Sequence, residues 1–205
     1  MLSYGFVSAS RFDAPACGKC FEFTYDGGSH TDSPLHIVRI GSQRLLGKSL
    51  IVQATDLDPS LSKGQFDLKV PGGGPNGPDG CKRQFFNARP ALDLGNAQGG
   101  FLAKCRGCDA QGHCAAIDLG GVNYGKPEME IRQEILSCFL RMCDAAFERS
   151  DDNRYKDWSL LHNSCHWFVN FYEAADEPSM HYREVECPHE IKHRVLTERR
   201  LRNRE

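Results

Sequence analysis

Cysteine is the feature that most constrains this chain, because ten of its 205 residues are cysteines. The cytosol keeps thiols reduced, so a structural disulfide framework is typical of exported proteins, and the even count suits such a framework. The opening residues MLSYGFVSASRF make a poor signal peptide, since they lack a basic n-region and a full-length apolar segment. We therefore expect a secreted protein whose present sequence begins inside a domain.

Size and charge narrow the class further. A chain of 205 residues with 40% hydrophobic residues can bury one sizeable core, so we expect a single domain. The net charge of -2 and the pI near 6.4 argue against the basic face on which nucleic-acid binding depends. No apolar run approaches the roughly 20 residues needed to cross a bilayer. We expect a neutral partner, with no nucleic acid and no membrane.

Short β-rich runs separated by Gly, Ser, Asp and Pro dominate the first third of the chain. These runs are Phe21 with Phe23, LHIVRI (35–40), SLIVQAT (49–55) and FDLKV (66–70). Two later runs, CHWFVNFYEA (165–174) and MHYREVEC (180–187), also alternate and predict two more strands. Closely spaced strands favour a barrel or sandwich, so the predicted class is mainly β.

One helix is predicted from Glu128 to Arg149, with Pro127 suited to its first turn. Its apolar residues recur at helical spacing: Ile131, Ile135, Leu136, Phe139, Leu140, Cys143 and Phe147. Residues from about 86 to 127 have weak periodicity and many Gly and Ala, which indicates a long insertion. Residues 191–205 form a basic tail, interpreted as a solvated helix or frayed end rather than a docking arm.

The insertion carries a local group of metal-binding residue types. Cys105, Cys108, His113 and Cys114 could together ligate zinc through three thiolates and an imidazole. A single CxxC is a weak signal, however, and an adjacent His and Cys rarely both reach one metal. Disulfides or free thiols are therefore the favoured interpretation, and we predict no metal and no cofactor.

Four ordered blocks carry a resemblance to a known family. They are ACGKCFEFTY (16–25), GKSLIVQATD (47–56), GQFDLKVPGGGPNGPDGC (64–81) and CHWFVNFYEAADEPSMHYREVECP (165–188). Together these blocks resemble the catalytic domain of glycoside hydrolase family 45 endoglucanases. The resemblance implies a six-stranded double-psi β-barrel over residues 1–190. It also implies a substrate groove and a monomer that cleaves β-1,4-glucan internally with inversion.

Asp67 is the predicted catalytic residue. It lies between Phe66 and Leu68 on a predicted strand, and on that pattern alone it would point to solvent. The resemblance implies that Asp67 is the general acid, which protonates the leaving oxygen. The triple glycine that follows would let a sugar chain approach the backbone closely, whereas the spacing of a dinucleotide fingerprint is absent. The predicted substrate-binding residues are Gln65, Gly72, Gly73, Gly74 and Asp58.

The chain departs from the family at the second catalytic group. The family's catalytic base precedes a YGF block, which here begins at Tyr4, so no counterpart is found. Gln65 replaces a histidine found in many relatives, and the family's loop carboxylate falls near Ser60, with Asp58 the nearest substitute. Inversion requires a second carboxylate about 6.5–9.5 Å from the acid. We therefore expect impaired hydrolysis, with Asp58 or Asp13 as substitute bases, and a non-catalytic expansin-like glucan-binding protein as the alternative.

The resemblance also implies a pattern of cysteine pairing. Cys20 should bond to Cys187, and Cys165 to either Cys138 or Cys143. Cys17 and Cys81 should be unpaired, since the family partners of both precede the YGF block. The aromatic residues Trp167, Phe168 and Phe171 could stack on a sugar, but alternating aromatics in a strand are more often part of a core.

Overall fold

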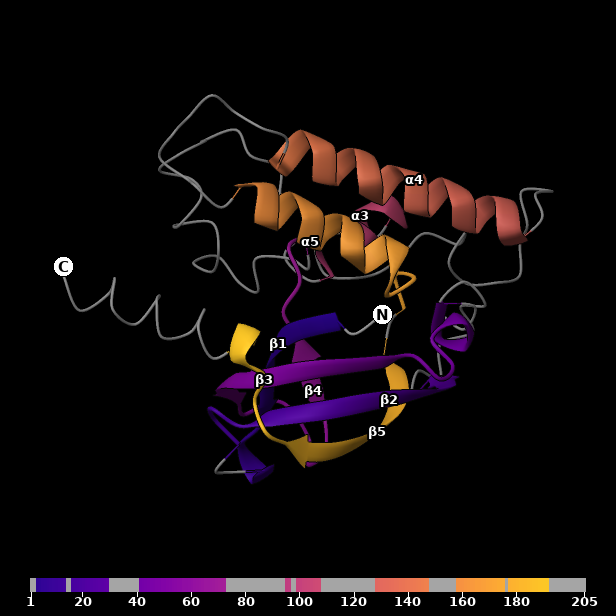
Figure 1. Ribbon diagram of the computed structural model, residues 1–205. Helices are drawn as coiled ribbons and strands as arrows, with labels where there is room; N and C mark the ends of the chain where they lie inside the picture. Colours follow the sequence, from indigo (N-terminus) through magenta and orange to yellow (C-terminus); the bar gives the residue numbers. More distant parts are fainter. Residues whose placement is uncertain are drawn as a thin grey trace. The chain divides into compact units, whose positions relative to one another are not determined.

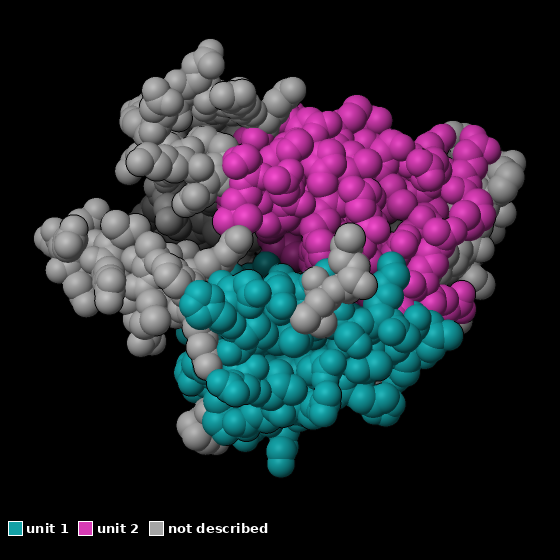
Figure 2. Space-filling model, viewed as in Figure 1, with its two compact units in different colours: residues 1–27, 46–69, 179–205 teal, residues 28–45, 70–178 magenta. Residues whose placement is uncertain are grey.

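The computed structural model describes residues 3–13, 16–29, 41–72, 95–96, 99–107, 128–147, 158–175 and 177–191. The chain divides into two compact units (Figure 2). Unit 1 consists of residues 1–27, 46–69 and 179–205, and unit 2 consists of residues 28–45 and 70–178. Unit 1 contains nearly all of the sheet, and unit 2 contains the long helices. The predicted strand LHIVRI, most of the predicted insertion and the tail after residue 191 lie outside the described residues.

Unit 1 is built on a mixed five-stranded sheet with the order β4-β1-β3-β2-β5 (Figure 1). Its strands are β1 (Ser3–Ser10), β2 (Cys20–Ser29), β3 (Ser49–Asp58), β4 (Phe66–Leu68) and β5 (Pro178–Val185). β1 pairs with β3 in parallel and with β4 antiparallel, while β2 pairs with β3 antiparallel. The sheet fits the predicted mainly-β class. β1 was not predicted, because Ser and Gly interrupt its apolar residues.

One face of the sheet is apolar. Val7 of β1 pairs with Ala54 of β3 and with Leu68 of β4, and Ala9 pairs with Phe66. Val7, Ala9 and Ala54 are completely buried. Alternate residues of a strand point to opposite faces of the sheet. Ser8 lies between Val7 and Ala9, so its side chain belongs to the opposite face.

A β-bulge at Thr55 changes which face β3 presents. The β1–β3 register runs from Ser3 opposite Leu50 to Val7 opposite Ala54, and then continues with Ser8 opposite Asp56. Thr55 is therefore the extra residue, and a shift of one residue moves every later side chain to the opposite face. Without the bulge, Asp56 would share the face of Ala54. With the bulge, Asp56 lies on the same face of the sheet as Ser8.

Unit 2 contains α3 (Gly100–Cys105), α4 (Glu128–Phe147) and α5 (Trp158–Asn170). An aromatic core holds them together: the Phe101 and Phe139 ring centroids lie 5.7 Å apart, and those of Phe139 and Phe168 lie 5.1 Å apart. α4 confirms the predicted helix. Among the described helices, none is both long enough and apolar enough to span a membrane.

The prediction of a strand over CHWFVNFYEA is wrong, because most of this run lies in α5. The physical reason is visible in its burial. Cys165, Phe168 and Val169 are buried, and their spacing of three and four residues is that of one helix face. Alternation and helical spacing both fit this short aromatic run, and packing against α4 selects the helix. Phe168 belongs to the core, as expected, while Trp167 stacks on Phe171 with 5.2 Å between ring centroids.

The described disulfides confirm one predicted pair and decide another. Cys20 and Cys187 are bonded, with 5.1 Å between their Cα atoms. Of the two partners left open for Cys165, Cys143 is the one that bonds to it, and Cys138 is bonded to Cys105 instead. The thiolate of Cys105 is therefore not available to a metal, and the zinc alternative that included it is wrong.

The free thiol predicted at Cys17 is confirmed, and the side chain is exposed. Cys81, Cys108, His113 and Cys114 lie outside the described residues, so their predicted states stay predictions.

Candidate active site

Three carboxylates and two serines gather on the polar face of unit 1. Ser8, in the middle of β1, pairs with Asp56 of β3 on one side and with Asp67 of β4 on the other. Two residues further along β1, Ser10 pairs with Asp58. Directly paired residues on neighbouring strands present their side chains to the same face. We call the group of Asp56, Asp58, Asp67, Ser8 and Ser10 the acidic face.

The spacing of Asp56 and Asp67 suits two cooperating carboxyl groups. Neighbouring strands lie about 4.8 Å apart, so residues two strands apart have Cα atoms roughly 10 Å apart. The two carboxyl groups of inverting glycosidases are about 6.5–9.5 Å apart, a range within side-chain reach of that backbone separation. Ser8 forms the buried floor between Asp56 and Asp67, with 6% of its surface exposed.

Hydrogen bonds keep Asp56 ionised. Its Oδ1 accepts hydrogen bonds from Ser8 Oγ at 3.0 Å and Thr55 Oγ1 at 3.3 Å, and pairs with Lys69 Nζ at 2.7 Å. Partial burial would raise the pKa of Asp56, but the contacts with Lys69, Ser8 and Thr55 outweigh it and lower that pKa. Among the described residues, the donors to Asp56 all reach Oδ1, which leaves Oδ2 as the oxygen that can accept a proton.

Asp67 has the opposite tendency. Its side chain is exposed at the surface, yet the surrounding protein displaces enough water to raise its pKa. The negative charges of Asp58 and Asp56 raise the pKa of Asp67 further, while the positive charge of Lys69 lowers it in part. The pKa of Asp67 is therefore raised and that of Asp56 lowered, although both lie on one face. Such a difference lets one carboxyl group act as the acid and the other as the base.

Asp58 and Asp13, the two substitute bases predicted from the sequence, both accept hydrogen bonds from nearby loops. Asp58 Oδ1 accepts hydrogen bonds from the Ser60 backbone nitrogen at 2.7 Å and from Ser60 Oγ at 2.6 Å, and these bonds lower the pKa of Asp58. Asp13 Oδ2 accepts a hydrogen bond from the Gly64 nitrogen at 2.8 Å. Asp58 lies on the acidic face, whereas Asp13 orders the loop before β4.

The predicted substrate-binding residues have different surroundings. Gln65 Oε1 accepts a hydrogen bond from the Ser62 nitrogen at 2.8 Å and so closes the turn before β4. Gly72 belongs to unit 2 and has a φ of +85°, and a Cβ there would lie 2.4 Å from the Phe101 ring. The close approach at Gly72 is therefore explained by packing on Phe101. Gly73 and Gly74 lie outside the described residues.

Asp56, Ser8 and Lys69 were not predicted as site residues. A signal for Asp56 was present in SLIVQATD, where Leu50, Val52 and Ala54 alternate on one face. Strict alternation would put Asp56 on that same apolar face, which a carboxylate avoids. A bulge between Ala54 and Asp56 resolves this conflict.

Comparison with known proteins adds a second line of evidence. No protein-family model matches the chain. The chain is 33% identical over 204 residues to Endoglucanase B of Cellvibrio japonicus, a match that covers 98% of this chain and 34% of that protein. It resembles endoglucanases along nearly its whole length. An endoglucanase of Cryptopygus antarcticus is 23% identical over 190 residues, covering 91% of this chain and 56% of that protein.

The chain thus spans about a third of one relative and just over half of the other. Among solved structures, a cellulase from the Antarctic springtail Cryptopygus antarcticus aligns with a TM-score of 0.48 at 21% identity. That alignment covers 91% of this chain and 60% of the springtail chain.

Proposed function

We propose that this chain is an endo-β-1,4-glucanase of the glycoside hydrolase family 45 type, which hydrolyses cellulose or a related β-glucan with inversion. The observation that carries the proposal is the row Asp56–Ser8–Asp67 across three strands, with carboxyl groups of opposite pKa tendency at its two ends. The likeness to proteins named endoglucanase supports the substrate class. The mixed sheet is compatible with a six-stranded double-psi β-barrel, and the disulfides are compatible with secretion.

Asp67 is the general acid in this proposal. A raised pKa keeps its carboxyl group protonated to higher pH than an ordinary aspartic acid, so it can donate that proton to the glycosidic oxygen. The bond between the anomeric carbon and this oxygen then breaks, and the leaving sugar departs as a neutral alcohol. Asp58 and Asp56 assist by holding negative charge near Asp67, which disfavours early loss of its proton.

Asp56 is the general base. Its carboxylate is ionised at the pH at which Asp67 remains protonated, and Oδ2 can take a proton from a water molecule on the opposite side of the sugar ring. The water oxygen bonds to the anomeric carbon as the leaving oxygen departs, so the configuration inverts. Ser8 and Lys69 orient the carboxylate through Oδ1.

A second function is favoured by one specific contact. The ion pair between Lys69 Nζ and Asp56 Oδ1, at 2.7 Å, weakens Asp56 as a proton acceptor. A chain in which no base acts would bind glucan and loosen it without cleavage, as an expansin-like protein does. The two functions differ in one measurable property, the release of new reducing ends.

The test measures endo-cleavage of soluble carboxymethyl cellulose by the unaltered chain, by Asp67→Asn and by Asp56→Asn. General acid or base assistance is worth about 10²–10⁴-fold, so each variant should lose at least about 100-fold in rate. Glu184→Gln is the matched control, because Glu184 is an exposed acid of the same unit that pairs with Lys19. Binding to cellulose without cleavage by the unaltered chain would establish the alternative function, and equal rates in all variants would contradict the proposed site.

A further inference from the structure

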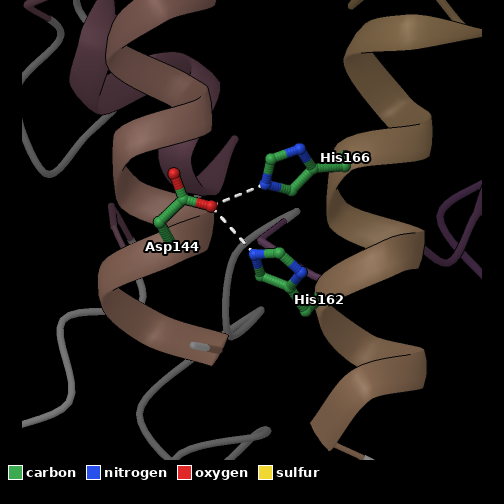
Figure 3. Close-up of side chains that lie close together, drawn as sticks. All are labelled: Asp144, His162 and His166. Atoms are coloured by element: carbon green, nitrogen blue, oxygen red, sulfur yellow. Dashed lines mark hydrogen bonds and ion pairs between the residues drawn. The ribbon is translucent and has the colours of Figure 1, made fainter. Parts of the chain in front are cut away.

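A second group of chemically capable side chains lies in unit 2, between α4 and α5 (Figure 3). His162 Nε2 lies 2.8 Å and His166 Nε2 lies 2.7 Å from the same oxygen, Oδ1 of Asp144. One ligand atom from each of these three residues lies within 4.8 Å of the other two. All three side chains are partly exposed, from 28% for His166 to 47% for Asp144, so solvent can reach the group.

The helices position these side chains through elementary geometry. His162 and His166 are four residues apart on α5, which brings both imidazoles to one helix face. Asp144 reaches them from α4. Both imidazoles direct Nε2 at Oδ1 of Asp144, so the two nitrogens converge on one point rather than diverging into solvent (Figure 3).

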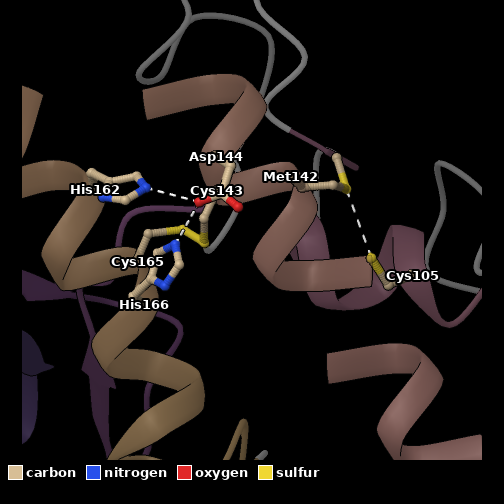
Figure 4. Close-up of a disulfide and its surroundings, with 7 residues drawn as sticks. All are labelled: Cys105, Met142, Cys143, Asp144, His162, Cys165 and His166. Carbon is tan, nitrogen blue, oxygen red and sulfur yellow. Dashed lines mark hydrogen bonds and ion pairs between the residues drawn. A yellow bond between two sulfur atoms is a disulfide. The ribbon is translucent and has the colours of Figure 1, made fainter. Parts of the chain in front are cut away.

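A disulfide next to the group fixes the distance between the two helices. Cys143 precedes Asp144 on α4 and Cys165 precedes His166 on α5, and the two cysteines are bonded with 5.8 Å between their Cα atoms (Figure 4). Both members of this bridge are fully buried. The covalent link lies one residue from two members of the group, so the backbone that carries them is held before any ligand arrives.

The donor set matches a particular class of metal ion. Two imidazole nitrogens and one carboxylate oxygen are ligands that Zn²⁺ takes at about 2.0–2.2 Å, with water as a fourth ligand. Ligands around a tetrahedral ion of that size lie about 3.4 Å apart, so the present separations of 2.7 and 2.8 Å must widen by about 0.6–0.7 Å. A side-chain rotation of the half-exposed Asp144 supplies such a movement.

We propose that Asp144, His162 and His166 form a binding site for a divalent transition-metal ion of the Zn²⁺ class. The ion takes the place of the Nε2 hydrogens that face the carboxylate, which pass to Nδ1 or to water, and it links α4 to α5 beside the disulfide. This site is independent of the acidic face and of the proposed hydrolysis. Oxygen-preferring Ca²⁺ does not suit it, because two of its three protein ligands are nitrogens.

The test is a calorimetric titration of the full, disulfide-bonded chain with Zn²⁺, and with Ca²⁺ as a comparison ion. A Cys17→Ser background removes the thiol that is free among the described cysteines and would otherwise compete for zinc. We expect saturable Zn²⁺ binding to this background, no Ca²⁺ binding, and a loss of affinity of at least tenfold in Asp144→Asn, His162→Gln and His166→Gln. The Gln variants keep a polar group beside Asp144, and near-ultraviolet circular dichroism checks that each variant is folded.

His181→Gln is the matched control, because His181 is an exposed histidine on β5 outside the group. Its Zn²⁺ affinity should equal that of the background. The proposal is overturned if the background fails to bind Zn²⁺, which would make the group a hydrogen-bonded trio only. It is equally overturned if the three ligand variants bind Zn²⁺ as tightly as His181→Gln does.

Discussion

The two units position their chemical groups in different ways. In unit 1, Asp56 and Asp67 come together through backbone pairing, since each lies opposite Ser8 across a strand boundary. In unit 2, His162 and His166 come together through the repeat of a single helix, and a disulfide brings Asp144 to them. A sheet site therefore depends on long-range register, whereas a helix site depends on local spacing and one short covalent bridge. The two sites should fail under different substitutions.

The largest effect is expected from the bridge of unit 1. Cys20 and Cys187 close a loop of 167 residues, for which chain entropy predicts a stabilisation of about 5 kcal/mol. The double variant Cys20→Ala, Cys187→Ala should lower the free energy of unfolding by up to that amount in urea denaturation. Glucan cleavage should be lost at lower temperature, while Zn²⁺ affinity at 25 °C should be unchanged. A loss of Zn²⁺ binding with cleavage intact would show that this bridge supports the zinc site rather than the acidic face, and would contradict the prediction.

The bridge of unit 2 should have a smaller effect on stability and the opposite effect on function. Cys143 and Cys165 are 22 positions apart, so the same entropy argument predicts about 3 kcal/mol. The variant Cys143→Ala, Cys165→Ala should bind Zn²⁺ more weakly and still cleave carboxymethyl cellulose. If cleavage fell as far as zinc binding, the two sites would not be independent.

The acidic face predicts two substitutions whose effects on stability have opposite signs. Ionised Asp67 is disfavoured in the folded state, so Asp67→Asn should raise the free energy of unfolding at pH 7, by less than about 1 kcal/mol because the group is exposed. This gain should vanish at a pH low enough to protonate Asp67 in both states. Asp56→Asn should lower the free energy of unfolding at pH 7, and that loss should vanish as pH falls through the lowered pKa of Asp56. Urea denaturation at several pH values measures both, and equal signs would contradict the assignment.

The smallest effect concerns Lys69. Its positive charge lowers the pKa of both Asp56 and Asp67, so Lys69→Met should move both limbs of the pH profile of kcat/KM to higher pH. Lys63→Met is the control, since Lys63 is an exposed lysine of the neighbouring loop. An unchanged profile in Lys69→Met would mean that neither carboxyl group controls the rate.

Local patterns predicted much of the fold. Alternation in SLIVQAT located β3, helical spacing located α4, and the resemblance of two distant blocks predicted the bond between Cys20 and Cys187. The helix α5 could not be separated from a strand by pattern alone, because its aromatic run fits both periods. Its histidine pair was missed for the same reason, since His162 and His166 share a face only if the segment is helical.

The acidic face lay largely beyond prediction from the sequence. Asp67 was identified through the resemblance, but its partner was not. Ser8 and Asp56 are 48 positions apart, and their contact depends on a parallel pairing and on the bulge at Thr55. Neither feature follows from the composition of β1 or β3, because pairing across a sheet is decided by tertiary packing.

The identity of the general base is tested most directly by chemical rescue. Asp56→Ala removes the proposed base and leaves room for a small anion, and sodium azide supplies one that attacks the anomeric carbon without needing deprotonation. Incubation of Asp56→Ala with a soluble cello-oligosaccharide and azide should restore turnover and produce a glycosyl azide of inverted configuration, detected by nuclear magnetic resonance. Rescue of Asp58→Ala with no rescue of Asp56→Ala would contradict the account and assign the base to Asp58.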